Sequence, residues 1–189
     1  MCLAIVLPAG KSIPDNHLIE GWRRNPDGAG FAYVHKGKVV VKKGFMKQQD
    51  FMDAFLKERK KHPNKNFLIH FRIRSQGDRL AANTHPYEYQ HGAMIHNGTI
   101  SGTGAIYGKG KSDTELFLDK YGEQLSFDTV QEKKVQLGTA LDYNKLAFLF
   151  RGGSFLIVNE EKGVWEDGVW YSNAGYKGYT MTVNGRNVA

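Results

Sequence analysis

Cysteine is almost absent from this chain of 189 residues, in which Cys2 is the single example. One cysteine cannot form an internal disulfide, and it excludes a zinc site built from several thiolates. A protein without structural disulfides suits a reducing compartment, which would also keep a catalytic thiol reduced. We therefore expect a cytoplasmic protein.

Long hydrophobic runs are missing as well, and none approaches the roughly 20 apolar residues that cross a bilayer. The opening stretch 1–8 has no basic leader and is short for a signal peptide. Hydrophobic residues make up 41% of the chain and charged residues 24%, which is typical of a globular protein. We expect a single domain over residues 1–189, with no membrane association.

Charge is unbalanced, with a formal net charge of +7. Such a charge allows contact with nucleic acid or another acidic partner. The densest basic cluster, residues 57–62, falls at the end of a predicted helix, where cations stabilise the helix dipole. Neither a zinc-finger pattern nor an aromatic ribonucleoprotein signature accompanies it, so nucleic-acid binding has no support beyond charge.

Hydrophobic periodicity predicts sheets at both ends of the chain and helices between them. Helices are expected over 48–61, from 112 onward and over 126–138, the first because Phe51/Phe55 and Met52/Leu56 are paired at i,i+4. Residues after Gly175 are expected to be irregular. We expect strands over 2–7, 31–35, 38–42, 66–72, 93–96, 145–150, 154–158, 164–166 and 169–172. This order predicts an α+β fold of packed sheets covered by helices.

Cys2 follows the initiator methionine directly, and this position has chemical consequences. Aminopeptidases remove Met1 when the second residue is small, which would leave a thiol and a free α-amine on one residue. An α-amine titrates at about pH 7.7–8.0, so it can take the proton of the thiol. Cys2 would then supply both nucleophile and base. The alternative is a buried apolar residue that opens a strand.

Three further segments carry polar groups suited to an active site. The stretch His70-Phe-Arg-Ile-Arg-Ser-Gln-Gly77 ends a predicted strand in two arginines, and a guanidinium matches a carboxylate bidentately. In His96-Asn-Gly98, a side-chain amide and the next backbone N–H are suited to an oxyanion hole. Asp113, in Ser112-Asp-Thr-Glu115, is suited to a substrate ammonium. The alternatives are surface arginines, a plain Asn-Gly turn and a helix cap.

Histidines at 70, 85, 91 and 96 raise the question of a metal site. Their spacing gives no helical His-x-x-x-His pattern, and no helix is expected there. We therefore expect no metal site.

Together these segments resemble, in order, the glutaminase domain of class II glutamine amidotransferases, which are N-terminal nucleophile (Ntn) hydrolases. Cys2 is similar to the family's nucleophile, and Arg72 to the arginine that binds the glutamine α-carboxylate. Asn97 and Gly98 match the oxyanion-hole pair, and Asp113 the acid that holds the α-ammonium. The resemblance implies a four-layer αββα sandwich of two antiparallel sheets.

Other segments extend the resemblance, and some residues depart from it. Asn83-Thr-His-Pro86 and Asn25-Pro-Asp-Gly-Ala-Gly30 are similar to the family's asparagine–histidine–proline segment and glycine-rich strand entry. Gln76 and Gly77 complete the expected substrate-binding set, although Gln76 stands where histidine is common. Ile73 replaces a common aromatic residue, and the loop that closes over glutamine would pack differently.

The resemblance implies hydrolysis of the glutamine side-chain amide to glutamate and ammonia through a γ-glutamyl thioester, without a cofactor. We expect a glutaminase subunit that feeds a separate synthase partner, because little chain is left for a second active site. Two alternatives stay open. One is a hydrolase of other γ-glutamyl amides, and the other is a catalytically silent binding or regulatory protein.

Overall fold

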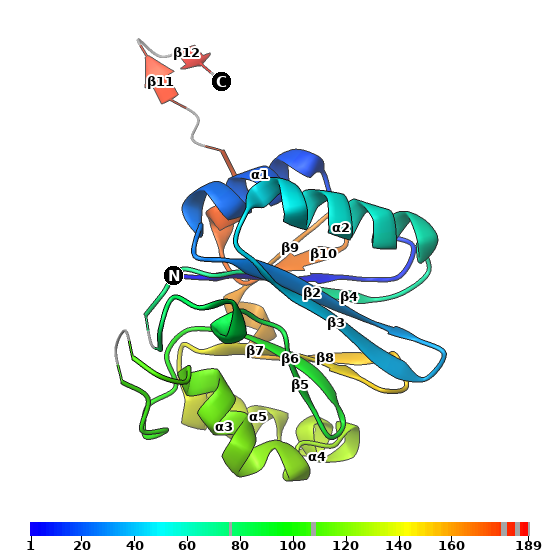
Figure 1. Ribbon diagram of the computed structural model, residues 1–189, viewed down its shortest axis with the longest axis vertical. Helices are drawn as coiled ribbons and strands as arrows, with labels where there is room; N and C mark the ends of the chain where they lie inside the picture. The colour runs from blue at the N-terminus through cyan, green and yellow to red at the C-terminus, as the bar shows by residue number, and fades with distance from the viewer. Residues whose placement is uncertain (76, 107–108, 179–180, 184–185, 189) are drawn as a thin grey trace.

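Two antiparallel sheets lie face to face in the computed structural model, which describes residues 1–75, 77–106, 109–178, 181–183 and 186–188 (Figure 1). The first sheet has the order β3-β2-β4-β1-β10-β9 and the second the order β5-β6-β7-β8. The first comprises β1 Leu3–Leu7, β2 Ala29–His35, β3 Lys38–Phe45, β4 Phe67–Phe71, β9 Val164–Glu166 and β10 Val169–Tyr171. The second comprises β5 Tyr87–Tyr89, β6 Gly92–Asn97, β7 Lys145–Phe150 and β8 Phe155–Val158.

Helices cover the outer face of each sheet (Figure 1). The first sheet is covered by α1 Asp15–Arg24 and α2 Gln48–Lys61, and the second by α3 Asp113–Tyr121, α4 Phe127–Glu132 and α5 Lys134–Leu141. Short 3-10 turns are η1 Ala81–Asn83, η2 Gly122–Gln124, η3 Glu160–Lys162 and η4 Ala174–Tyr176. The α+β prediction is confirmed, and the order helices, sheet, sheet, helices is compatible with a four-layer sandwich.

Strand β1 shows why the first sheet is apolar on both faces. Leu3, Ile5 and Leu7 belong to the core under α1 and α2. Ala4 and Val6 point the other way, into the core between the two sheets. Because neighbouring side chains of a strand alternate between faces, a strand buried on both faces needs an unbroken apolar run. β1 is therefore fixed in the middle of the molecule, with Cys2 just before it.

Two predicted helices begin where the sequence indicates. Helix α2 has the predicted bounds, with Phe51 and Phe55 fully buried, whereas Leu56 lies at the edge of the apolar face and is 40% exposed. Helix α3 is capped by Ser112, whose Oγ accepts a hydrogen bond from the Glu115 N–H at 3.2 Å. The cap satisfies one of the free N–H groups of the first turn and holds Asp113 at the helix start.

Other elements differ from the prediction. Helix α1 was not predicted, although Leu18 and Trp22 are a buried i,i+4 pair on it. The helix expected over 126–138 is two short helices, because Lys133 leaves the helical region with ψ of 13°. The expectation of an irregular tail is wrong in part, since β11 Met181–Val183 pairs with β12 Arg186–Val188. Among the described residues, no helix is long and apolar enough to span a membrane.

Candidate active site

Cys2 immediately precedes β1. It therefore lies at the end of the first sheet where β1 begins and the neighbouring β4 ends. Its Sγ–H donates to the Ile73 carbonyl oxygen at 3.3 Å, and Sγ accepts from the Ile73 N–H at 3.4 Å. The Cys2 carbonyl oxygen accepts from Asn173 Nδ2 at 2.8 Å. The thiol is thus held by the residue that follows Arg72, and the Cys2 backbone is held from the opposite side by the residue that follows Ser172.

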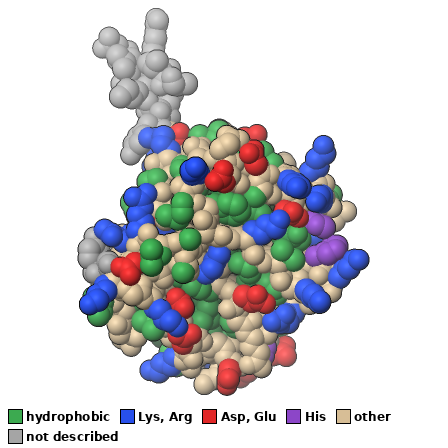
Figure 2. Space-filling view, viewed as in Figure 1, with side chains coloured by type: hydrophobic (Ala, Val, Ile, Leu, Met, Phe, Trp, Pro, Cys, Tyr) green, Lys and Arg blue, Asp and Glu red, His purple; other side chains and the backbone are tan. Residues whose placement is uncertain are grey.

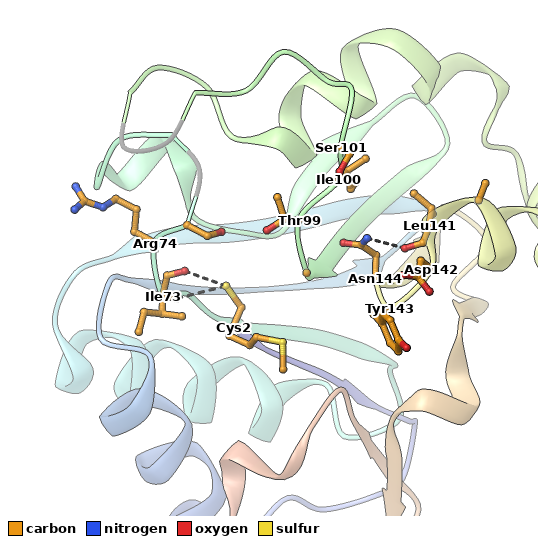
Figure 3. A pocket seen from close by; sticks show the side chains of 14 residues that line it. Cys2, Ile73, Arg74, Thr99, Ile100, Ser101, Leu141, Asp142, Tyr143 and Asn144 are labelled. Carbon is orange, nitrogen blue, oxygen red and sulfur yellow. Dashed lines mark hydrogen bonds between the residues drawn. The ribbon is translucent and has the colours of Figure 1, made fainter.

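Two hollows meet at Cys2. The first, here called the inner pocket, has a volume of about 10 Å³. It is lined by Cys2, Arg72, Ile73, Ser75, His85, His96, Gly98, Ser112 and Asp113. The second, here called the outer cavity, has a volume of about 620 Å³ and is lined by residues 1–2, 73–75, 98–101 and 140–144 (Figure 3). Cys2 lines both hollows, so its thiol lies where they join.

The inner pocket combines one cation with one carboxylate. Arg72 is 3% exposed, and its guanidinium donates to the Asp78 carbonyl oxygen at 3.0 Å. Asp113 is 5% exposed, with Oδ2 accepting from the Ile100 N–H at 2.7 Å and Oδ1 from the Thr114 N–H at 3.0 Å. These hydrogen bonds fix the position of the carboxylate. Opposite charges in one small pocket match a zwitterion such as a free amino acid.

Gly98 lies in both hollows, with its φ at +145°. A Cβ added here would come within 2.1 Å of Asn144 Oδ1, so only glycine fits. Asn144 is itself fixed, because its Nδ2 donates to the Leu141 carbonyl oxygen at 2.6 Å. The backbone at Gly98 is therefore held against a rigid neighbour, as a hydrogen-bond donor at a reaction centre requires.

Asn97 occupies a different place from the one its predicted role suggests. Its side chain is 1% exposed and lines neither hollow among the described residues. Its Nδ2 donates to Ser172 Oγ at 2.8 Å, and Ser172 Oγ also accepts from the Ala4 N–H at 2.9 Å. Asn97 Oδ1 has no hydrogen-bond partner among the described residues. In this arrangement the amide ties the second sheet to β1 beside the nucleophile.

A chain of hydrogen bonds runs from the inner pocket to the wall of the outer cavity. The Asn144 amide donates to Leu141, so Asn144 Oδ1 accepts from His96 Nε2 at 2.7 Å. His96 Nδ1 then accepts from the Thr114 hydroxyl at 2.9 Å, and this hydroxyl accepts from His85 Nε2 at 3.0 Å. This direction leaves His85 Nδ1 as a buried acceptor without a partner in the described part of the chain.

Burial sets the protonation of the groups around the site. It raises the pKa of the Cys2 thiol, although the Ile73 N–H and the charges of the N-terminus and Arg72 lower it. Burial also lowers the pKa of His70 to about 3 and that of His85 well below its usual range. Near neutral pH the thiol is protonated and the histidines are neutral. A nucleophilic Cys2 therefore needs a base beside it.

The remaining predicted site residues lie in the segment after Arg72. Gln76 is outside the described residues. Gly77 has φ of +71° and its N–H donates to the Ile106 carbonyl oxygen at 3.1 Å, away from both hollows. Asn83 Nδ2 donates to the carbonyl oxygens of Asp78 and Gly110 at 3.0 and 2.8 Å. Gly77 and Asn83 thus fasten this segment to the one before α3.

Several residues that build the site were not predicted from the sequence. Ile73 holds the thiol through its backbone, which carries no side-chain signal. Ser172 follows β10, and it reaches the site because β10 pairs with β1. Asn144 precedes β7, and it reaches the site because β7 pairs with β6. Their signal was weak, since a single serine or asparagine beside a strand is common.

Neither a metal cluster nor a single basic stripe marks the described surface. Among the described residues, no group of three or more His, Cys, Asp or Glu side chains is placed to hold a metal ion. On the face shown in Figure 2, lysine and arginine side chains are spread out and interspersed with acidic ones. This face therefore adds nothing to the charge argument for nucleic-acid binding.

Comparisons with known proteins assign no family to this arrangement. The chain matches no protein-family model and no curated protein.

Proposed function

We propose that this protein is the glutaminase unit of a class II glutamine amidotransferase, with the Ntn hydrolase fold. The observation that carries the proposal is the meeting of four distant segments at one pocket, which brings together Cys2, Arg72, Gly98 and Asp113. A thiol, a cation, a carboxylate and a glycine N–H are the groups needed to hydrolyse the side-chain amide of a free amino acid. The layered α+β architecture is compatible with this fold.

Substrate recognition follows from the two buried charges. Arg72 binds the α-carboxylate of glutamine, and Asp113 binds the α-ammonium with the lone pairs that its backbone contacts leave. Anchoring both α groups sets the side-chain amide against Cys2 Sγ, which is catalysis by positioning. The inner pocket has a volume of about 10 Å³, so it has to widen before an amino acid enters.

The chemistry begins with removal of Met1, which is 81% exposed and open to an aminopeptidase. The freed α-amine of Cys2 takes the thiol proton, and Sγ attacks the amide carbon. The Gly98 N–H stabilises the oxyanion, and Asn97 joins it if its amide turns from Ser172. The protonated amine gives its proton to the leaving ammonia, and water then releases glutamate from the thioester. This sequence of steps uses no cofactor.

A separate synthase partner that receives the ammonia belongs to the same proposal. A second candidate function, a silent binding protein, would keep Met1, because an acylated Cys2 nitrogen cannot act as a base. Its only support is the net positive charge.

The test is intact mass before and after treatment with 6-diazo-5-oxo-L-norleucine, a glutamine analogue that alkylates such thiols. We expect loss of Met1 and one adduct at Cys2, with Cys2→Ala and Cys2→Ser unlabelled, folded and inactive on glutamine. Retained Met1 with no adduct would make the silent binding protein the better interpretation. Glutamine hydrolysis by Cys2→Ala would remove the nucleophile assignment.

A further inference from the structure

The inner pocket and the outer cavity are lined by different functional groups. Arg72 and Asp113 line the inner pocket, whereas Tyr143 and its neighbours line the outer cavity. Cys2 and Gly98 line both. If the proposed function holds, the glutamyl part of the substrate binds on the inner side. The group attached to the scissile amide nitrogen then leaves on the outer side.

The outer cavity is far larger than the leaving group of glutamine. Ammonia is about as large as a water molecule, which takes up roughly 30 Å³ in the liquid. The outer cavity has about 620 Å³, which is within the range of pockets that bind organic ligands. A site that releases ammonia alone has no need for this space.

The wall opposite Arg74 offers an aromatic surface on a rigid support (Figure 3). Tyr143 is 77% exposed, and Leu141 and Ile100 add apolar surface. Asn159 Nδ2 lies 2.7 Å from the carbonyl oxygens of both Asp142 and Asn144, which flank Tyr143. The backbone on both sides of Tyr143 is therefore fixed, and its exposed ring offers a flat surface to an aromatic or apolar group.

We propose that the preferred substrate is a γ-glutamyl amide whose nitrogen carries an aromatic or apolar group, and that this group binds in the outer cavity against Tyr143. This inference rests on the nucleophile and the glutamyl-binding groups of the proposed function, and it favours the γ-glutamyl amide hydrolase over a subunit that feeds ammonia to a synthase. Cys2 Sγ forms a bond to the γ-carbonyl carbon, and the bond from that carbon to nitrogen breaks. The thiol proton passes through the Cys2 α-amine to the leaving nitrogen, which departs as a primary amine. Water then cleaves the thioester to glutamate.

The experiment compares L-γ-glutamylbenzylamide with L-glutamine at equal concentrations of the processed protein. Benzylamine and ammonia have similar basicity, so the comparison reports binding rather than leaving-group chemistry. Glutamate release is measured for both substrates. We expect kcat/KM for the benzylamide to exceed that for glutamine at least about tenfold.

Tyr143→Ala is expected to lower the ratio of the two kcat/KM values about tenfold. Tyr121→Ala is the matched control, because Tyr121 is a partly exposed tyrosine on α3 that does not line the outer cavity. It should leave the ratio as it is. Circular dichroism checks that both variants are folded.

The outcomes separate this inference from the proposed function. A Cys2-dependent enzyme that prefers glutamine, or uses both substrates equally, would overturn the inference and leave the glutaminase proposal intact. A benzylamide preference that survives Tyr143→Ala would overturn the placement of the amine. Failure to hydrolyse either substrate, with no adduct on Cys2, would overturn both proposals.

Discussion

Arg72 and Arg74 stand two residues apart just after β4, yet they face different hollows. Arg72 lines the inner pocket and Arg74 the outer cavity. Backbone hydrogen bonds hold both residues in place, since the Arg72 N–H donates to the Gly28 carbonyl oxygen at 2.8 Å and the Arg74 N–H to Asp27 Oδ2 at 2.9 Å. The two arginines therefore offer a direct test of where the substrate carboxylate binds.

Arg72→Ala should raise the KM for glutamine about 10–100-fold, because a charge-assisted hydrogen bond in a buried site is lost. Arg74→Ala is the matched variant and should raise it far less. Steady-state glutaminase assays on both variants give the answer. A larger effect in Arg74→Ala would place the carboxylate in the outer cavity instead.

Gly98 is the residue at which steric exclusion is strongest near the nucleophile. In Gly98→Ala the new Cβ would meet Asn144 Oδ1, so either the backbone at 98 or the His96–Asn144 hydrogen bond must shift. A displacement of this kind is expected to lower kcat about 100-fold. Gly152→Ala, with nothing within 4 Å of the added Cβ, is the control and should be fully active. Normal turnover in Gly98→Ala would show that this backbone does not form the oxyanion hole.

At the scale of elements, the connection between α5 and β7 forms one wall of the outer cavity. The conformation of this connection is held by one side chain, that of Asn159. Asn159, at φ of +57°, places Nδ2 within 3.1 Å of three carbonyl oxygens, those of Gly138, Asp142 and Asn144. An amide with two hydrogens thus serves three acceptors at the end of a helix, where carbonyl groups otherwise lack partners.

Asn159→Ala should lower the free energy of unfolding by about 2–3 kcal/mol, since one buried and two partly buried carbonyl groups lose their donor. Urea unfolding followed by circular dichroism measures the change. Asn16→Ala, at an exposed position of α1, should change it by less than about 0.5 kcal/mol. Equal stability of the two variants would mean that solvent replaces the Asn159 amide without cost.

The elements that sequence reasoning predicted are those whose apolar pattern is local. Strand β1 and helix α2 have regular patterns, and their predicted bounds agree with the structure to within a residue or two. Helix α1 was missed because its buried face amounts to Leu18, Gly21 and Trp22, too few for a clear period. The break at Lys133 was missed because it depends on how α4 and α5 pack over β8, which no local pattern encodes.

In the candidate site, too, the local segments could be predicted from the sequence, but their meeting could not. Cys2, Arg72, Gly98 and Asp113 were predicted because each sits in a distinctive short segment. Their meeting depends on pairings such as Leu3 with Phe71 in β1 and β4, which the segments alone do not reveal. The outer cavity was not foreseen at all, because its wall comes from the end of α5 and has no residue type that signals chemistry.

For the molecule as a whole, the two sheets are joined near the site by buried imidazoles. His70 of β4 has its Nε2 2.9 Å from the His96 carbonyl oxygen of β6. The ring centroids of His70 and His85 lie 4.1 Å apart. The Nδ1 atom of each ring is buried without a hydrogen-bond partner in the described part of the chain. A proton added to either ring would create an unpaired N–H and a charge in a dry interior.

This arrangement predicts a loss of stability in mild acid. Burial lowers the pKa of His70 to about 3 and also lowers those of His85 and His96, whereas an unfolded histidine titrates near 6.5. As the pH falls below 6.5, the unfolded chain binds protons that the folded protein refuses, so the free energy of unfolding decreases. Each histidine contributes up to about 1.4 kcal/mol per pH unit.

Urea titrations at pH 7, 6 and 5 measure this slope. In His70→Gln the amide can still donate to the His96 carbonyl oxygen. This variant should reduce the slope of the free energy of unfolding against pH by the contribution of one histidine. His91→Gln is the control, because the His91 ring is only partly buried at the surface, and it should keep the full slope. A free energy of unfolding that stays constant from pH 7 to pH 5 would mean that the folded protein takes up these protons as readily as the unfolded chain. The sheets would then not be joined by neutral imidazoles.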